Sequence, residues 1–389
     1  MQDTNTANQM RILHVMSGFG GGISSFIFNK AKQMPEYNVI FDVATYDECS
    51  PEFESAIYAT GGQIYRLQNP KKKGTKAFTK SFSAPFEENK YDLVHCHIEG
   101  YRAIPYYQIA KKFGVQRFYI HAHLVNDYKI KNLKDKLLYG FGKKANTRMT
   151  TDFVGCGKLA IRSVFGSKTD LKASMVIPNS IDVSDYNYSD EAYAKLKAEG
   201  RNALGVSDNT IVIGHVGRLM PVKNHKKTLK IGKYILDNQI DAKIFIIGAG
   251  NLENELKQAV KDQGLDEVIS FTGRISPISS FYPSLDVLLL PSFTEGLPTT
   301  VVEVQGAGVP TVMSDTITDE VDLGLGMVAT CGLDDDPSVW YDKLAEMAQL
   351  QIPDAPTRIQ AIEEKRFSNE ASAKLYVDYF TGKIHDYQI

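Results

Sequence analysis

The stretch DVLLLPSFTEGLPTTVVEVQGAGVPTVMSD (286–315) decides the fold class of this chain. After Asp286 it has an unbroken apolar run at 287–290, passes through a loop that contains Gly and Pro, and continues into a helical segment before a second, mainly apolar run at 309–315. Apolar strands that alternate with helices are typical of a parallel sheet, in which both faces of each strand are covered. The stretch therefore predicts a strand–helix–strand unit of an α/β protein.

The same alternation extends along the rest of the chain. Further apolar runs that predict strands lie at 11–17, 39–46, 62–67, 92–98, 117–123, 152–157, 173–179, 210–219, 243–250 and 267–274. Helical patterns lie at 24–34, 101–114, 189–205, 225–238, 254–264 and 369–382. This organisation predicts doubly wound parallel sheets with crossover helices.

A length of 389 residues is about twice that of a usual domain, so we expect two domains. We predict a flexible tail at 1–9, a first Rossmann-like domain at 10–180 and a second at 209–368. The segment 181–208 is expected to connect them. The pattern alone leaves the last helical segment free to pack on either domain.

Composition favours an ordinary globular protein of the cytoplasm. Hydrophobic residues make up 43% and charged residues 23%, and no run of about 18 apolar residues predicts a membrane span. The N-terminal residues lack the pattern of a signal peptide. The four cysteines are far apart and form no CxxC pair, which predicts isolated thiols in a reducing compartment rather than disulfides or a zinc site: Cys49, Cys96, Cys156 and Cys331.

Charge is distributed unevenly along the chain. Residues 1–180 carry 25 Lys and Arg against 15 Asp and Glu, whereas the remainder carries 19 against 31. The basic residues at 71–80 and 128–144 are interspersed with Leu, Tyr and Phe, as in segments that rest on an anionic membrane face. An ordinary amphipathic core helix at 128–144 explains that segment equally well. Nucleic acid is disfavoured as a partner, because no recognisable binding module accompanies the basic residues.

Ligands of open parallel sheets bind beyond the carboxyl ends of the strands, so the loops there are candidate sites. The loop 18–22 (GFGGG) follows the first strand and can bring backbone N–H groups close to a ligand, although a tight turn explains it as well. After the strand at 210–217, Arg218 and Lys223 lie on one loop. Two cations at such a position suit a diphosphate, on which charge grows as a sugar departs.

The loop and helix after the strand at 286–290 carry two carboxylates, Glu295 and Glu303. Pro298 suits the first position of the helix, and the amide groups of 297–300 point out of its open end. One carboxylate could bind sugar hydroxyls and the other a ribose. Favourable interaction with the helix dipole explains one Glu but not the pair.

Two histidines, His121 and His123, end the strand at 117–123 and share one face of it. Zinc binding would need a third ligand, for which His95 and His97 on a neighbouring strand are the only candidates. A structural hydrogen bond is the more common role for a histidine at such a position. We therefore expect no metal site.

With these residues the sequence resembles family 4 of the retaining glycosyltransferases, whose fold, called GT-B, has two doubly wound Rossmann-like domains facing a central cleft. The resemblance spans about residues 10–380. Glu295 and Glu303 have the family's E-x7-E spacing, and PNSIDV (178–183) is similar to its interdomain PNGID stretch, with Ser180 in place of Gly. Arg218 and Lys223 match its paired basic residues.

The resemblance implies a role for each matching residue. Arg218 and Lys223 would hold the diphosphate, Glu303 the ribose, and Glu295 the donor sugar. His123 would lie near the reacting sugar. Further donor-binding residues implied by the family are Gly21, Gly22, Gly273, Arg274, Ile275, Gly296, Leu297, Pro298 and Thr299. The final segment 369–389 would cross back onto the first domain.

The implied activity is a retaining transfer of a hexosyl or N-acetylhexosaminyl group from a nucleotide diphosphate sugar, with a UDP-sugar expected, to a glycan or lipid-linked saccharide in bacterial exopolysaccharide or capsule assembly. No cofactor and no metal are expected, because two cations neutralise the diphosphate. The protein would work in the cytoplasm, at the inner face of the membrane where the acceptor is lipid-linked. A nucleotide-sugar epimerase of the same fold and a non-catalytic subunit that binds a glycan or partner are the alternatives.

Overall fold

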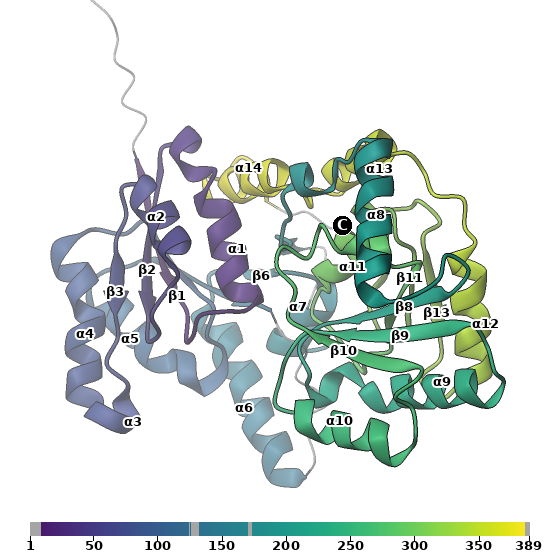
Figure 1. Cartoon of the computed structure of the whole chain (residues 1–389). Helices are drawn as coiled ribbons and strands as arrows, with labels where there is room; N and C mark the ends of the chain where they lie inside the picture. Colours follow the sequence, from purple (N-terminus) through teal and green to yellow (C-terminus); the bar gives the residue numbers. More distant parts are fainter. Residues whose placement is uncertain (1–8, 124, 126–131, 170–172, 386–389) are drawn as a thin grey trace, which may run out of the picture. The chain divides into compact units, whose positions relative to one another are not determined.

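Two compact units make up the chain in the computed structural model, which describes residues 9–123, 125, 132–169 and 173–385 (Figure 1). The first unit comprises Met1–Ser180 with Arg366–Ile389, and the second comprises Ile181–Lys365. The expectations for the tail at 1–8 and for the final residues 386–389 lie outside the described residues. Within the described part, no helix combines the length and the apolar content needed to cross a bilayer.

The first unit is built on a seven-stranded sheet with the order β3-β2-β1-β4-β5-β6-β7 among the described residues. All its strand pairs are parallel. The strands are β1 (Met10–Val15), β2 (Val39–Thr45), β3 (Ile64–Arg66), β4 (Leu93–Cys96), β5 (Arg117–Ala122), β6 (Phe153–Gly155) and β7 (Ser174–Val176). The helices are α1 (Gly22–Ala31), α2 (Pro51–Ala59), α3 (Pro70–Lys73), α4 (Thr75–Glu88), α5 (Ile104–Lys112), α6 (Leu133–Met149), α7 (Lys158–Phe165) and α14 (Asn369–Phe380).

Helix α14, from the end of the chain, packs against α1 in the first unit (Figure 1). Its Tyr376 and Phe380 belong to the same buried core as Phe26. The buried Lys30 of α1 donates hydrogen bonds to the Pro178 carbonyl oxygen and to Ser372 Oγ, each at 3.0 Å. The last helix therefore contributes to the core of the first unit.

The second unit contains a six-stranded sheet with the order β10-β9-β8-β11-β12-β13, again with parallel pairs. Its strands are β8 (Ile211–Val216), β9 (Ala242–Ile247), β10 (Ile269–Gly273), β11 (Val287–Leu290), β12 (Thr311–Ser314) and β13 (Val328–Cys331). Its helices are α8 (Asp190–Leu204), α9 (His225–Asp237), α10 (Glu253–Asp262), α11 (Thr299–Gly306), α12 (Pro337–Ala348) and α13 (Ala355–Glu364). Figure 1 shows helices on both sides of this sheet.

The segment 181–208, expected as a connection, belongs to the second unit. Its helix α8 is anchored by Arg201, whose Nη1 lies 2.8 Å from Asp286 Oδ2. Lys197 Nζ approaches the other carboxylate oxygen of Asp286 at 3.1 Å, and the Val212 amide donates to Oδ2 at 2.9 Å. One carboxylate thus joins α8 to the start of β8.

The expectation of two doubly wound parallel sheets is confirmed, and each predicted apolar run overlaps one strand. The sequence interpretation missed β13, a short edge strand whose first three residues are partly or fully exposed and so carry no apolar run. The four cysteines are free thiols, as predicted. Strands buried on both faces give continuous apolar runs, whereas an edge strand does not need one.

Candidate functional site

The loops at the carboxyl ends of β8, β9 and β10 are joined by backbone hydrogen bonds. The Gly217 amide donates to the Ile247 carbonyl oxygen at 2.9 Å, and the Gly248 amide donates to that of Gly273 at 2.8 Å. Gly248 has a φ of 137°, and a Cβ atom there would lie 2.0 Å from the Gly217 carbonyl oxygen. Only glycine permits this close approach, so the loop that carries Arg218 and Lys223 rests directly on the next loop.

Lys223 and Glu295, predicted from separate loops, are brought together by the fold. The Phe293 amide donates to the Val222 carbonyl oxygen at 2.9 Å, which ties the loop after β11 to the loop after β8. Lys223 Nζ then lies 2.8 Å from Glu295 Oε1, with side-chain exposures of 14% and 16%. Such partial burial reduces solvent screening of the pair, so its charges act strongly on a ligand that enters beside them.

Glu303, the other predicted carboxylate, lies on α11 and accepts a hydrogen bond from the hydroxyl of Tyr282, at 2.5 Å between Oη and Oε2. Burial raises the pKa of Glu303, while the Tyr282 hydrogen bond and the charge of Lys223 act in the opposite direction. Tyr282 is buried and was not predicted as a site residue. It lies in the sequence FYPSLD, which carries no pattern that would mark it as a partner of Glu303.

Helix α11 begins beside this carboxylate without a side-chain cap on its N-terminus. Pro298, expected as the first helical residue, is the residue before the helix because its ψ of 91° is not helical. Leu297 and Pro298 are buried, whereas Gly296 and Thr299 are half-buried. An uncapped helix start offers backbone N–H groups and partial positive charge to oxygen atoms of a ligand.

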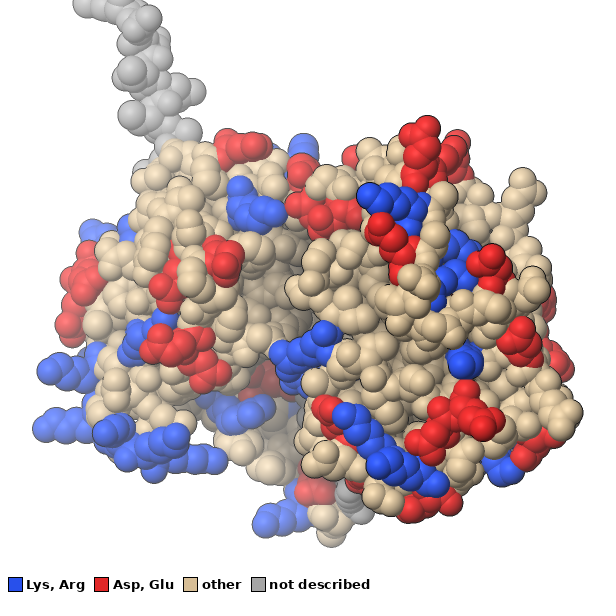
Figure 2. All heavy atoms as spheres, in the orientation of Figure 1, with Lys and Arg blue, Asp and Glu red and all other residues tan. Residues whose placement is uncertain are grey.

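The remaining predicted donor residues of the second unit lie at the same edge of the sheet. Gly273 ends β10 with a φ of 72°, and its carbonyl oxygen accepts from Gly248. Arg274 is exposed and Ile275 half-buried in the segment that follows. Arg218 is exposed on the loop that carries Lys223. The space-filling view of Figure 2 shows Lys and Arg side chains (blue) on the surface of this unit, among Asp and Glu side chains (red).

Gly21, Gly22 and His123 belong to the first unit. The amide of Gly21 donates to Ser24 Oγ at 3.0 Å, and the amide of Gly20 donates to the same oxygen at 3.2 Å. These two N–H groups already have an acceptor, which differs from the expectation that this loop offers its amides to a ligand. Gly22 starts α1, where a Cβ atom would lie 3.5 Å from Asn179 Nδ2.

His123 lies at the end of a row of buried imidazoles on one face of the first sheet. His97 Nδ1 is 2.7 Å from His123 Nε2, and His95 Nε2 is 3.0 Å from His121 Nδ1. The prediction that His121 and His123 share a face is confirmed by their stacked rings, with centroids 4.4 Å apart. Within the described residues, ring nitrogens fall into two groups of potential metal ligands, which share His97: His14, His95 and His97, and His97, His121 and His123.

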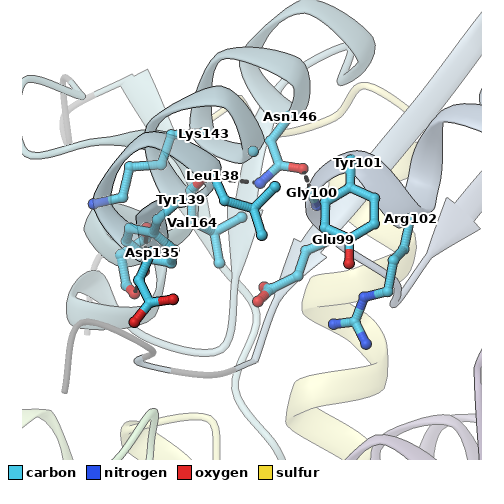
Figure 3. Close-up of a pocket in the computed structure, with 12 residues that line it drawn as sticks. Glu99, Gly100, Tyr101, Arg102, Asp135, Leu138, Tyr139, Lys143, Asn146 and Val164 are labelled. Carbon is cyan, nitrogen blue, oxygen red and sulfur yellow. Dashed lines mark hydrogen bonds between the residues drawn. The ribbon is translucent and has the colours of Figure 1, made fainter. Parts of the chain in front are cut away.

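A pocket of about 250 Å³ in the first unit was not predicted (Figure 3). It lies between α6, α7 and the 3-10 turn Gly100–Ala103. Asn146 lines the pocket and links two of its walls, since Oδ1 accepts from the Gly100 amide at 2.6 Å and Nδ2 donates to the Val164 carbonyl oxygen at 2.9 Å. Figure 3 shows Tyr101, Arg102 and Lys143 among the side chains around it.

Helix α6 exposes apolar side chains beside this pocket. The exposed fractions are 72% for Leu133, 67% for Leu137, 48% for Leu138 and 55% for Phe141. Their spacing places them on one stripe of the helix. The interpretation of 133–144 as an ordinary core helix is therefore wrong, because the stripe faces solvent; residues 128–131 lie outside the described part of the chain.

Comparisons with known proteins identify relatives over most of the chain. The sequence profile of the family described as "Glycosyl transferases group 1" matches residues 197–320. A Bacillus subtilis protein named as glycosyltransferase EpsF is 30% identical over 353 residues, which cover 89% of this chain and 90% of that protein. An Escherichia coli relative, named UDP-Gal:alpha-D-GlcNAc-diphosphoundecaprenol alpha-1,3-galactosyltransferase, is 29% identical over 239 residues, 59% of each chain.

Among solved structures, Anabaena HepE in complex with UDP-glucose has the same fold. Its TM-score is 0.72 and its sequence identity 17%, with 96% of this chain and 100% of that chain covered. WaaG, a glycosyltransferase involved in lipopolysaccharide biosynthesis, matches with a TM-score of 0.64 and 13% identity over 95% of this chain and all of its own. The likeness extends across both units.

Proposed function

Because this chain belongs to the group 1 glycosyltransferases, with the GT-B fold, we propose that it transfers a hexosyl or N-acetylhexosaminyl group from a UDP-sugar with retention of configuration. The acceptor is a hydroxyl group of a glycan or of a lipid-linked saccharide in bacterial surface polysaccharide assembly. The name of the E. coli relative, which contains a UDP-sugar donor and an acceptor linked to diphosphoundecaprenol, supports this class of donor and acceptor. The name of the B. subtilis relative supports glycosyl transfer.

The observation that carries the proposal is the meeting of Lys223, Glu295 and Glu303 at the edge of the second sheet. Three charged side chains from three segments, close to an uncapped helix start, suit a ligand with a diphosphate and several hydroxyl groups. In this arrangement Lys223 and Arg218 bind the diphosphate, Glu303 binds the ribose, and Glu295 orients the sugar. Tyr282 positions the Glu303 carboxylate.

Catalysis then rests on positioning and charge. As the bond between the sugar and the phosphate breaks, negative charge grows on the leaving diphosphate, and the cations Arg218 and Lys223 stabilise it. The leaving phosphate oxygen accepts the proton of the acceptor hydroxyl, which attacks the same face of the sugar, so that the configuration is retained. His123 contacts the reacting sugar. The proposed mechanism requires no metal, so EDTA should leave the rate unchanged.

Donor binding is the first test. Thermal shift with UDP and with UDP- and GDP-sugars should show stabilisation by one nucleotide family, about 2.7 kcal/mol at 100 times the dissociation constant. Glu303→Ala and Lys223→Ala should abolish the shift. The matched control is Lys226→Ala, which removes an exposed lysine three residues away and should leave the shift intact. A folded wild-type chain without any shift would favour a non-catalytic subunit.

Reaction outcome is tested separately. The anomeric configuration of the product, determined by NMR coupling constants, should match that of the donor. Inversion would contradict same-face attack. Release of an altered sugar without an acceptor would instead favour the epimerase.

We also propose that α6 places the first unit on an anionic membrane, where a lipid-linked acceptor would lie. Its apolar stripe of Leu133, Leu137, Leu138 and Phe141 is flanked along the helix by Lys134, Lys136, Lys143 and Lys144. This combination is typical of helices that lie in the membrane interface. Basic side chains also gather at the end of the unit that carries α3, at the lower left of Figure 2.

Sedimentation with vesicles that contain phosphatidylserine tests membrane contact. The wild type should bind at low salt, and the double variant Leu137→Asp/Phe141→Asp should not. Val339→Asp is the matched control, because Val339 is an exposed apolar residue of the second unit (47%) and should not be needed. Equal binding of all three proteins would contradict the role of α6.

A further inference from the structure

A continuous chain of hydrogen bonds runs through six buried side chains of the first unit. His121 Nδ1 contacts His95 Nε2 at 3.0 Å, and His95 Nδ1 contacts the Tyr376 hydroxyl at 3.0 Å. That hydroxyl lies 3.4 Å from His14 Nε2. His14 Nδ1 contacts His97 Nε2 at 3.0 Å, and His97 Nδ1 contacts His123 Nε2 at 2.7 Å. This row of hydrogen bonds thus ends at His123, which we place beside the reacting sugar.

Strand register and two helices bring these groups together. His14 of β1 pairs with His95 of β4, and His121 lies on the neighbouring β5. His97 and His123 follow at two-residue spacing, each one residue beyond the end of its strand. Helix α1 covers them with Phe26, whose ring centroid lies 4.5 Å from that of His121. Helix α14 supplies Tyr376.

The imidazoles are neutral near pH 7. Burial, followed by the charge of Lys30, lowers the pKa of His14 and of His123 to about 3. Burial is also the first cause that lowers the pKa of His95, His97 and His121 well below the ordinary value. Each ring therefore carries one N–H group and one lone pair.

Three orderings of the protons satisfy every link, because the Tyr376 hydroxyl can donate one hydrogen bond and accept two. In the first, each ring is protonated on Nε2, and in the second each is protonated on Nδ1. In the third, His121 and His95 are protonated on Nδ1, whereas His14, His97 and His123 are protonated on Nε2. Tyr376 then accepts a hydrogen bond from both of its neighbours, and its own O–H group has no acceptor in this row of side chains. A change of direction at any other point costs at least one hydrogen bond. At the far end, His121 Nε2 is buried without a hydrogen-bond partner among the described residues. The first ordering leaves a buried N–H group there without an acceptor, and the third leaves the buried O–H group of Tyr376 without one. The second ordering leaves only a lone pair and is therefore favoured.

We infer that the other five side chains of this row of hydrogen bonds are positioning residues that fix His123 as its Nδ1–H tautomer. His97 donates to His123 Nε2, so His123 has an N–H group left to donate and no lone pair left to accept a proton. His123 then acts on an oxygen of the bound sugar as a hydrogen-bond donor and not as a base. This inference rests on the proposed function for the position of His123, but the tautomer is independent of turnover.

Long-range proton–nitrogen NMR spectra of the full chain, labelled with ¹⁵N-histidine, read the tautomers directly. We expect the Nδ1–H tautomer for the five histidines of this row. The signals of His123 are assigned by their loss in His123→Asn. An Nε2–H tautomer at His123 in the wild type would overturn the inference, whether or not the chain transfers sugar. Absence of turnover with His123 as Nδ1–H would instead count against the proposed function alone.

Two variants of His97 separate hydrogen bonding from packing. His97→Gln can accept from His14 through its carbonyl oxygen and donate to His123 through its amide nitrogen, so it should keep the Nδ1–H tautomer and most of the activity. His97→Leu fills similar space but cannot donate, so the tautomers of His123 should mix. We expect kcat for His97→Leu to fall about tenfold, with KM for the UDP-sugar unchanged, because one hydrogen bond to the transition state is lost.

Equal tautomers or equal kcat values for the two His97 variants would overturn the inference. Thermal melting shows whether each variant folds. If His97→Leu does not fold, the spectra of His97→Gln still test the inference, because they show whether His123 keeps its Nδ1–H tautomer. Titration of the wild type with Zn²⁺ completes the test. One tightly bound ion per chain, with loss of the imidazole N–H signals, would identify the cluster as a metal site and contradict the inference.

Discussion

Acidification between pH 7.5 and pH 5 should destabilise the first unit steeply, because its buried histidines resist protonation. In the unfolded chain a histidine titrates near pH 6.5. In the folded chain the pKa of His14 and of His123 is lowered to about 3 by burial and by Lys30. Between these values the unfolded state binds protons that the folded state cannot bind, so stability is present above pH 6.5 and is lost as the pH falls.

The size of the effect follows from that difference in proton binding. At pH 5, a histidine with an unfolded pKa of about 6.5 that stays neutral in the folded state costs about 2 kcal/mol relative to pH 7.5. His14 and His123 together cost about 4 kcal/mol. The lowered pKa values of the other three buried histidines act in the same direction. Such a loss is a large part of the stability of a typical domain.

Urea unfolding at several pH values measures this loss. Trp340, the sole tryptophan of the sequence, is buried in the second unit, so its fluorescence reports that unit while circular dichroism reports both. The second unit has two acid-sensitive histidines of its own. Burial and Lys223 lower the pKa of His225 to about 4, and burial is the first cause that lowers the pKa of His215 well below its ordinary value. Comparison of the two signals separates the units.

Two variants test whether a buried neutral histidine causes this loss of stability at low pH. His123→Asn should reduce the loss of stability between pH 7.5 and pH 5 by about 2 kcal/mol, because one proton fewer distinguishes the two states. His385→Asn, which removes an exposed histidine of the same unit, should leave the loss unchanged. A first unit equally stable at both pH values, or equal losses in both variants, would refute the reasoning.

Three further predictions concern the second unit. Gly248→Ala should lower the free energy of unfolding by about 3 kcal/mol or more and abolish the donor-induced thermal shift, since its Cβ atom would collide with a neighbouring backbone carbonyl. Tyr282→Phe removes a hydrogen bond that lowers the pKa of Glu303, so Glu303 should become protonated at a higher pH than in the wild type. As the pH is lowered, calorimetric titration should therefore show the affinity for UDP falling at a higher pH in the variant. Asp286→Asn leaves the buried Arg201 without its counter-charge and should cost about 3–5 kcal/mol in urea unfolding; a smaller cost than that of an exposed Asp→Asn change would contradict the anchoring role.

The sequence by itself determined the fold class. Strands covered on both faces are largely apolar, so runs such as 287–290 marked them without further information. The same reasoning missed β13, because an edge strand is solvated on one side. Helix α6 was ambiguous in sequence, since an apolar stripe looks alike whether it faces a core or solvent.

Candidate site residues could be selected from the sequence where they lie in one loop and the helix after it, as for Glu295 and Glu303, whose contacts with a ligand stay predictions. Pairings between distant segments could not be predicted from it. The contact of Tyr282 with Glu303 and that of Lys223 with Glu295 depend on how separate loops meet at a sheet edge. A carboxylate in the sequence carries no mark of which distant group will donate to it.

The row of buried histidines shows most clearly which contacts a local sequence pattern predicts and which depend on the tertiary structure. The sequence placed His121 and His123 on one face of a strand, because side chains alternate along β structure. It gave no indication that His14 and Tyr376, 362 residues apart, would complete the row. Strand order and the packing of the last helix decide that contact, because both are set by long-range burial of apolar surface and not by any local pattern.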